Sequence, residues 1–447
     1  MASPLLSPTR VPAPTRLLAR PETAARGDAP VRLRPVGLPV RRDLGRVVQP
    51  RLGFSDIPAS AVLHAARGKG AVSRDVLAKS TDLSVATVNR QVVALLDAGL
   101  LRERADLAPS GLVGRPRVPV EIDHEPYLVL GVYVGLNAVS IVAGDIRGKV
   151  LDSAEFATPR GNVKDALEQI ASSARQYLVR WPRRRPLWAG VASVGSVDPV
   201  SGTTSRAELG WKDAPLAGAI SAKLGLPTSL AVQVEAVAAA ELLLPPSNHV
   251  VTSPVRERTT LHFYGRESLG TALTIGGRVH SPKSGPGTVA HLPVRSKLLL
   301  GHDGVGTLAE AVSDSAFALA WNRLTGAKPH SRSAQTVQDV IRQAAAGDSV
   351  AQELLGERSR LFGESAAIAA SFVNPDEVVL GGQALTAYPE AAEQVAKAFH
   401  EASAMPGVSV RATRLGSKVQ EFAALAVALS AVWADPIGAW RQAGLAA

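Results

Sequence analysis

Residues 73–99 read SRDVLAKSTDLSVATVNRQVVALLDAG, a pattern that predicts two short helices joined by a tight turn. Ser73 and Ser84 each stand where a side-chain oxygen would cap the first turn of a helix, and Gly99 stands where a helix commonly ends. The second predicted helix spans 84–98. Its apolar residues recur at spacings of three and four, which should place them on one buried face. These residues are Val85, Val88, Val92, Leu95 and Leu96.

The other face of the second helix carries hydrogen-bonding groups and no carboxylate. Such a composition suits a helix that enters the major groove of DNA, where base edges are read by short hydroxyl, amide and guanidinium groups. The alternative is an ordinary amphipathic helical hairpin whose polar face is solvated. The candidate DNA-contacting residues on this helix are Ser84, Thr87, Asn89, Arg90 and Gln91.

The sequence around the hairpin predicts a winged helix-turn-helix domain over residues 51–123. PASAVLHAAR at 58–67 predicts the first helix, and strands are expected at 100–104 and 118–122. Between these strands Arg115 and Arg117 flank a proline, next to Gly114. Guanidinium groups on such a loop suit the negative potential of a narrow minor groove. The alternative is an exposed basic turn.

Length and composition indicate a multidomain globular protein. A chain of 447 residues with 46% hydrophobic residues should form two or three domains. The sequence has no apolar run of membrane-spanning length and no secretory signal pattern, so we expect no membrane partner. Because there is no cysteine, disulfides, thiolate metal sites and thiol nucleophiles are excluded. We therefore expect a cytoplasmic, nucleoid-associated protein.

The net charge of +10 is concentrated at the N-terminus. Residues 1–50 hold nine arginines and three acidic residues, together with many prolines. A segment of this composition buries too little apolar surface to repay its chain entropy. We expect a disordered basic arm that adds phosphate contacts to DNA binding. The alternatives are a solvated tail and a translation start placed too far upstream.

From residue 124 onward the pattern changes to alternating strands and helices. Two successive β-rich halves predict two lobes around a cleft, with lobe one at 124–245 and lobe two at 246–418. A closing helix is expected at 419–432. The other expected helices span 163–181, 231–244, 307–325, 334–345 and 349–373.

Three segments resemble the ROK family (repressors, open reading frames, kinases), and specifically its winged-helix transcriptional regulators. They are GVASVGSVDP at 190–199, LGTALTIGGRVHSPKSGPGTVAHLPV at 269–294 and NPDEVVLGGQAL at 374–385. The resemblance covers about residues 58–435. It implies an actin-like (ribonuclease H-like) α/β domain of the two-lobed sugar-kinase type, after an all-α/winged-helix N-terminal domain.

The family's kinase residues are replaced in this sequence. Tyr133 stands at the aspartate of the phosphate-binding loop, Leu136 adds bulk there and Asn137 replaces a threonine. Gln233 stands at the aspartate that resemblance makes the catalytic base. An amide does not accept a proton at working pH, so phosphoryl transfer should be lost and no catalytic residue is predicted.

The residues that resemblance assigns to sugar binding are only partly retained. Thr288 replaces a glutamate, His291 is kept, and Glu310 lies near another sugar-contacting glutamate. With Gln233, these form the candidate effector site. The alternative for Glu310 is a first-turn residue favoured at a helix N-terminus.

The zinc cysteines of the family are absent from 299–308, so a family-type zinc site is excluded. His291, His302 and Asp303 are the remaining candidate ligands, but three scattered residues of this kind are more often part of a solvated loop. We expect no metal and no cofactor.

These observations predict a non-catalytic, DNA-binding transcriptional regulator. It would bind a double-stranded operator as a homodimer or higher homo-oligomer, since two half-sites multiply specificity. A small-molecule effector, a sugar or another metabolite, would gate it. The alternatives are a sugar kinase with an appended DNA-binding domain and an effector-blind DNA-binding scaffold.

Overall fold

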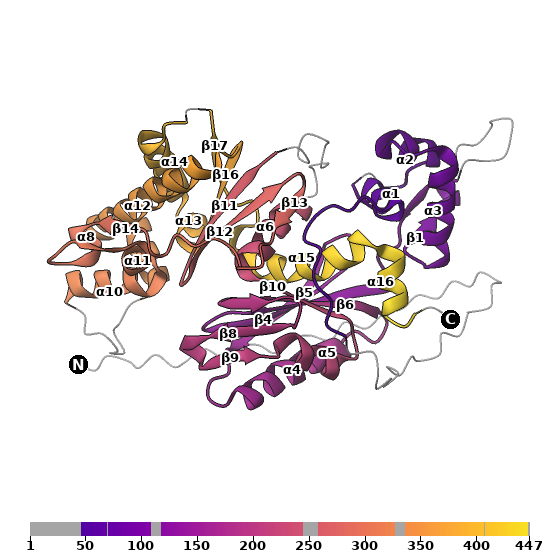
Figure 1. Cartoon of the computed structure of the whole chain (residues 1–447), viewed down its shortest axis with the longest axis horizontal. Coiled ribbons are helices and arrows are strands. Elements are labelled where there is room, and N and C mark those ends of the chain that lie inside the picture. The colour runs from indigo at the N-terminus through magenta and orange to yellow at the C-terminus, as the bar shows by residue number, and fades with distance from the viewer. Residues whose placement is uncertain are drawn as a thin grey trace, which may run out of the picture. The chain divides into compact units, whose positions relative to one another are not determined.

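The computed structural model describes residues 46–68, 70–108, 118–244, 258–326, 336–405 and 407–445. Its N-terminal helices and hairpin, drawn in indigo in Figure 1, form the predicted winged helix-turn-helix. In the hairpin, Leu101 pairs with Ile122 in antiparallel register. The elements are α1 (Pro58–Arg67), α2 (Arg74–Thr81), α3 (Val85–Asp97), β1 (Leu101–Glu103), a short 3-10 turn (Ala105–Leu107) and β2 (Val120–Ile122).

The caps that the sequence predicts are formed. The Ser73 hydroxyl accepts a hydrogen bond from the Val76 N–H at 3.4 Å, and Ser84 accepts one from the Thr87 N–H at 3.2 Å. Asp82 in the intervening turn has φ of 55°. These contacts satisfy N–H groups that a helix start leaves free and fix where α2 ends and α3 begins.

The apolar face of α3 is shorter than predicted. Val88, Val92 and Leu95 are fully buried, and Leu96 is half-buried against the same core. Val85, in contrast, is 51% exposed. Its spacing matches the buried face, but it is the first helical residue, and no described residue covers its side chain enough to bury it. The prediction of Val85 as a core residue is therefore wrong.

The first large sheet has strand order β10-β6-β3-β4-β5. Alternate residues of β3 point to opposite faces of the sheet, and both faces are buried. Leu128, Leu130 and Val132 pack with α4 and α5, whereas Tyr127 and Tyr133 pack with α15. The elements are β3 (Tyr127–Val134), β4 (Ala138–Gly144), β5 (Val150–Ala157), α4 (Val163–Val179), β6 (Arg185–Ser193), α5 (Leu216–Leu224), β10 (Thr228–Val232), α6 (Gln233–Leu243) and α15 (Val419–Ala434).

Helix α15 lies directly on β3 and β6 because glycines leave room for its backbone. A Cβ at Gly131 would lie 2.8 Å from the Leu425 nitrogen, and one at Gly190 would overlap Ala428. A short helix, α16 (Pro436–Gln442), follows α15. Within the described ranges no single helix has the length and apolar composition of a membrane span; one pair bent by 106°, Gly416–Ala434 with Pro436–Gln442, meets that criterion only together.

The second large sheet has strand order β13-β12-β11-β16-β17 and carries most of the remaining helices (Figure 1). The 25-residue helix α12 supplies Leu354, Leu355 and Phe362 to its core. The elements are β11 (Thr260–Gly265), β12 (Leu269–Ile275), β13 (Arg278–His280), β14 (Pro293–Arg295), α8 (Lys297–Leu300), β15 (Val305–Thr307), α9 (Leu308–Val312), α10 (Asp314–Thr325), α11 (Val337–Ala345), α12 (Ser349–Val373), β16 (Glu377–Gly381), α13 (Gln383–Ala387), α14 (Pro389–Ala402) and β17 (Ser409–Ala412).

Two predicted helices are wrong in extent. The 231–244 helix begins only at Gln233, because Ala231 and Val232 continue strand β10, parallel to β6. The 307–325 helix is broken at Ser313, which caps α10 through the Ala316 N–H. The sequence reading also missed α5, α16 and a small sheet of β7 (Ser196–Asp198), β8 (Thr203–Arg206) and β9 (Trp211–Ala214).

The predicted disordered arm at 1–50 extends too far. Residues 46–56, here called the connecting segment, pair with an edge strand of each large sheet. Val48 N–H donates to the Thr228 oxygen at 2.9 Å, and Phe54 N–H donates to the Gly277 oxygen at 3.0 Å. Residues 46–50 are therefore ordered by backbone hydrogen bonds to β10, which sequence composition alone does not reveal. The rest of the predicted arm lies outside the described residues.

Candidate nucleic-acid interface

Helix α3 presents an exposed arginine and several half-buried polar side chains beside its buried face. Arg90 is exposed, whereas Asn89 and Gln91 are half-buried. In the part of the chain that the structure describes, the Arg90 guanidinium makes no ion pair or hydrogen bond. An exposed cation of this kind is available for a phosphate or for the bidentate contact that arginine makes with guanine.

The Ser84 and Thr87 hydroxyls form a hydrogen bond within the helix cap, which would compete with hydrogen bonds to DNA bases. The Ser84 hydroxyl donates to the Thr87 hydroxyl at 3.0 Å while it accepts the Thr87 N–H. Val85 is exposed beside them, and its place on the predicted buried face gave no sign that it could be a candidate contact residue. An apolar side chain on the first turn of a recognition helix can meet a thymine methyl group.

The base of the wing is neutralised by ion pairs. Arg102 and Arg104 both contact Glu121, with nitrogen–oxygen distances of 2.7 and 3.1 Å. Glu121 is almost completely buried beneath the two guanidinium groups. Because each arginine is paired with this carboxylate, the two side chains are less available to DNA phosphates than unpaired arginines would be. The predicted tip residues Arg115 and Arg117 lie outside the described residues.

Tyr133, which the family resemblance places at the phosphate-binding aspartate, is a buried aromatic side chain. Tyr133 lies next to Tyr264, and both are 2% exposed. Burial raises the pKa of Tyr133 well above its ordinary value, helped by the neighbouring Tyr264, and raises the pKa of Tyr264 to about 12. Both hydroxyls therefore stay neutral and protonated near pH 7, and neither supplies a negative charge to hold a metal ion.

Gln233 lies at the start of α6, where its amide oxygen accepts a hydrogen bond from the Ser268 hydroxyl at 3.4 Å. Glu235 is buried two residues later and accepts one from the Ser281 hydroxyl at 2.8 Å. Burial raises the pKa of Glu235 to about 7. Residues two apart on a helix do not face each other, so Glu235 does not replace a carboxylate at the Gln233 position.

The four candidate effector residues form two pairs: Gln233 and Thr288 contact adjacent residues at the start of β12, and His291 lies near Glu310 at the start of α9. Thr288 donates its hydroxyl to the Leu269 oxygen at 3.3 Å, next to the Ser268 that contacts Gln233. His291 lies close enough to Glu310 to lower the pKa of that carboxyl, although hydrogen bonds from Thr307 lower it more. Glu310 accepts the Thr307 N–H at 2.8 Å in a capping box. The alternative interpretation of Glu310 as a helix-start residue thus has direct structural support.

The residues do not fit the zinc site that the family resemblance implies. His302 and Asp303 contact each other at 3.1 Å, but both side chains are fully exposed neighbours on a loop. Throughout the described ranges, no three His, Cys, Asp or Glu side chains are grouped to hold a metal ion.

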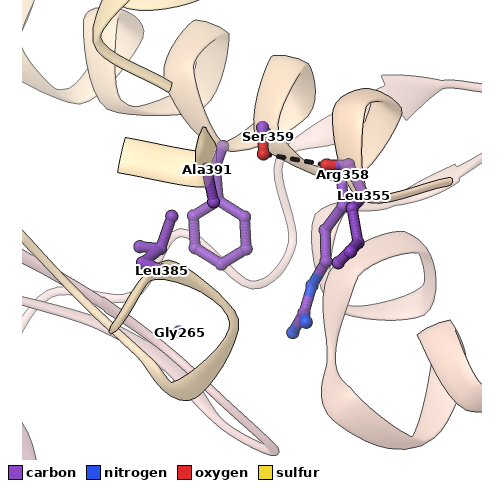
Figure 2. Close-up of a pocket in the computed structure, with 7 residues that line it drawn as sticks. Gly265, Leu355, Arg358, Ser359, Leu385 and Ala391 are labelled. Carbon is purple, nitrogen blue, oxygen red and sulfur yellow. Dashed lines mark hydrogen bonds between the residues drawn. The ribbon is translucent and has the colours of Figure 1, made fainter. Parts of the chain in front are cut away.

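A small pocket lies within the second large sheet's layer of helices (Figure 2). Its walls are apolar apart from Ser359 and the buried Arg358. The Arg358 guanidinium donates to the Val312 oxygen at 2.9 Å and to Asp314 at 2.7 Å, so it is held from one side by protein groups. The pocket was not anticipated from the sequence. The remaining lining residues are Gly265, Leu355, Phe362, Leu385 and Ala391.

The family model described as ROK family matches residues 129–418. The chain belongs to the ROK family. This confirms the predicted resemblance, and with it the actin-like two-lobed fold behind a winged helix-turn-helix.

Relatives and solved structures in the ROK family agree with this assignment. Transcriptional regulator Rv0485 of Mycobacterium tuberculosis is 49% identical over 404 residues, covering 89% of this chain and 91% of the relative. The N-acetylglucosamine repressor of Escherichia coli O157:H7 is 23% identical, covering 70% and 77%.

Two crystal structures share the fold. A ROK family transcriptional regulator, a homologue of the E. coli MLC protein, has a TM-score of 0.69 at 21% identity and covers 87% of this chain and 98% of its own. A ROK glucokinase from Streptomyces griseus, solved with glucose and AMPPNP, has a TM-score of 0.57 at 20% identity and covers 67% and 99%. The regulator matches the chain well beyond the part shared with the kinase.

Proposed function

We propose that this ROK protein is a non-catalytic, DNA-binding transcriptional regulator that reads its operator with α3. The observation that carries the proposal is the set of polar side chains on α3, where Arg90 is exposed beside Asn89 and Gln91 in a helix-turn-helix followed by the β1–β2 hairpin strands. Relatives that align over most of the chain are named transcriptional regulators. Arg115 and Arg117 on the wing would add minor-groove contacts.

The absence of catalysis is supported by the side chains at the former kinase positions. Phosphoryl transfer needs a carboxylate that takes the proton of the attacking hydroxyl and a loop that holds phosphates and Mg²⁺. Here Gln233 and the buried Tyr133 occupy those positions. A coupled ADP assay with a panel of hexoses should show no turnover, and measurable turnover would revive the kinase alternative.

The remaining parts of the proposal concern assembly and control. We infer a homodimer or higher oligomer that places two α3 helices on an operator in the cytoplasm, and a winged-helix domain over 51–123 followed by the ROK domain. An effector would bind near Gln233, Thr288, His291 and Glu310. It could act only by binding two arrangements of the protein with different affinity. Calorimetry with sugars and sugar phosphates would separate this from an effector-blind scaffold.

The DNA proposal is tested by selecting genomic fragments with the wild-type protein and measuring Arg90→Ala on them. A bidentate arginine–guanine contact is worth about 1–3 kcal/mol, so the ratio of operator to random-DNA affinity should fall at least about fivefold. Arg342→Ala, an exposed arginine on α11, is the control for the lost charge. If Arg90→Ala and Arg342→Ala bind the selected fragments equally well, α3 does not read the operator as proposed.

A further inference from the structure

The C-terminal end of α3 is held by a residue of the ROK domain. The Tyr127 hydroxyl donates a hydrogen bond to the Ala98 carbonyl oxygen at 2.6 Å. Ala98 ends α3, so its carbonyl is one of those that a helix leaves without a partner. Tyr127 is 4% exposed and Ala98 is 3% exposed, so this contact is shielded from water.

The same hydroxyl is also an acceptor. Trp440 on α16 donates its indole N–H to the Tyr127 oxygen at 3.1 Å. The tyrosine therefore uses its donor and its acceptor capacity at once, one toward α3 and one toward the C-terminal helix. Gly99 permits this approach, because a Cβ there would lie 3.3 Å from the Tyr127 oxygen.

Tyr127 lies on the strand that also holds Tyr133. Trp440 lies on α16, which follows α15 directly. Tyr127 begins β3, and Tyr133 lies near the other end of the same strand. Gln420, at the start of α15, lies close enough to the Tyr133 hydroxyl to act against the rise in its pKa. Gly131 lies between these two ends of β3 and lets the strand pack closely against α15. A movement of one element should therefore move the other.

We propose that Tyr127 and Trp440 are positioning residues that set the orientation of the recognition helix relative to the ROK domain. The inference rests on the proposed reading of DNA by α3. Neither residue touches DNA in this arrangement; both act through the Ala98 end of the helix. A rearrangement of β3 against α15 would then reach α3 through a pair of hydrogen bonds and change its fit to the major groove.

A second, separate contact keeps the winged helix docked when this pair is disturbed. The Arg67 guanidinium of α1 stacks 3.9 Å above the Trp433 ring and also donates to the Leu243 oxygen. Loss of the Tyr127 hydroxyl should therefore loosen the end of α3 without releasing the domain.

The test compares Tyr127→Phe with Tyr177→Phe in the full chain. Tyr177 is equally buried and donates its hydroxyl to Asp152 at 3.1 Å, away from α3, so it matches the chemical change. For each variant we would measure amide hydrogen exchange at Gly99 and Leu100, affinity for selected genomic fragments and for random DNA, and urea unfolding. Trp440→Phe, which removes only the indole donor, provides a second variant.

Loss of one hydrogen bond changes an equilibrium by up to about tenfold. We expect Tyr127→Phe to speed exchange at Gly99 and Leu100 by about that factor and to lower the operator-to-random ratio at least threefold, with Trp440→Phe in the same direction. Tyr177→Phe should leave both unchanged.

Equal exchange at Gly99 in Tyr127→Phe and Tyr177→Phe, or faster exchange with an unchanged operator-to-random ratio, would overturn the positioning role. If the wild-type protein itself fails to distinguish genomic fragments, the proposed function falls, and the exchange at Gly99 still decides whether Tyr127 holds the helix.

Discussion

Several side chains at or near the positions that the family resemblance assigns to kinase chemistry lie in the interior of the protein. Tyr133 and Tyr264 fill space and remain uncharged, and Gln233 contacts the Ser268 hydroxyl. Glu235 is the exception, because it is an ionisable group buried with one hydrogen-bond donor, Ser281. Burial of a carboxyl group disfavours its charged form, which links the ionisation of this residue to folding.

We predict that Glu235→Gln makes stability less dependent on pH. The pKa of Glu235 is raised from 4.5 to about 7 in the folded protein, so the folded state holds its proton more tightly than the unfolded state does. Its contribution to the free energy of unfolding is therefore complete below about pH 4.5, falls as the pH rises to about 7, and then levels off.

The full effect is on the order of 3 kcal/mol. Urea unfolding at about pH 5 and about pH 8 should show a larger decrease for wild type than for Glu235→Gln, with the exposed Glu353→Gln behaving like wild type. Identical decreases in wild type and Glu235→Gln would show that Glu235 does not titrate in this range.

At the scale of elements, the start of α3 combines a structural role with the recognition role that we propose. The Ser84 hydroxyl caps the helix and sits on the turn that would enter the groove. Helix α4 starts in a similar way, with Asn162 accepting the Lys164 N–H at 2.8 Å, but on a domain that is not proposed to contact DNA. The two caps therefore allow stability and DNA binding to be separated.

We predict that Ser84→Ala and Asn162→Ala each lower the free energy of unfolding by about 1 kcal/mol, the usual value of an N-cap. Only Ser84→Ala should also weaken binding to the selected genomic fragments, because it frays the first turn of α3. Chemical denaturation and fluorescence anisotropy with labelled DNA measure the two effects. A matching loss of DNA affinity in Asn162→Ala would mean that binding reports general stability.

At the scale of the whole molecule, the connecting segment joins parts that are distant in sequence. It pairs with β10 in the first large sheet and with β13 in the second, and α1 follows directly. Glu241 and Arg411, 3.1 Å apart, form another link between α6 and β17. One edge strand of each sheet is thus paired with this stretch of chain, which also keeps the paired backbone groups from bonding to other molecules.

We predict that Gly53→Val detaches the connecting segment from β13. A Cβ at Gly53 would lie 2.7 Å from the Arg278 Cα, so the backbone must move apart, and overpacking of this kind costs about 1–3 kcal/mol. Exchange of the Phe54 and Val279 amides should accelerate, while the Val48 amide on the β10 side should change less.

Gly407→Val is the control, because that exposed glycine has open space around its Cβ position. Unchanged exchange at Phe54 in Gly53→Val would mean that the segment does not depend on this close contact.

The sequence by itself determined the features that depend on neighbouring residues. The α2–α3 hairpin with its serine caps and the Ser349–Val373 helix follow from spacing and end residues. The family motifs identified the fold. These inferences succeed because cap hydrogen bonds and helical periodicity operate within a few residues.

Only the tertiary structure decided the features that depend on which distant residues meet. The change from β10 to α6 at Gln233 is hidden in an alanine-rich run that is buried on all sides, so it shows no periodicity. The exposure of Val85, the pairing of residues 46–56 with both sheets and the bond from Tyr127 to Ala98 likewise leave no local signal. Each is set by packing and hydrogen bonding between segments far apart in the chain, which composition and spacing do not encode.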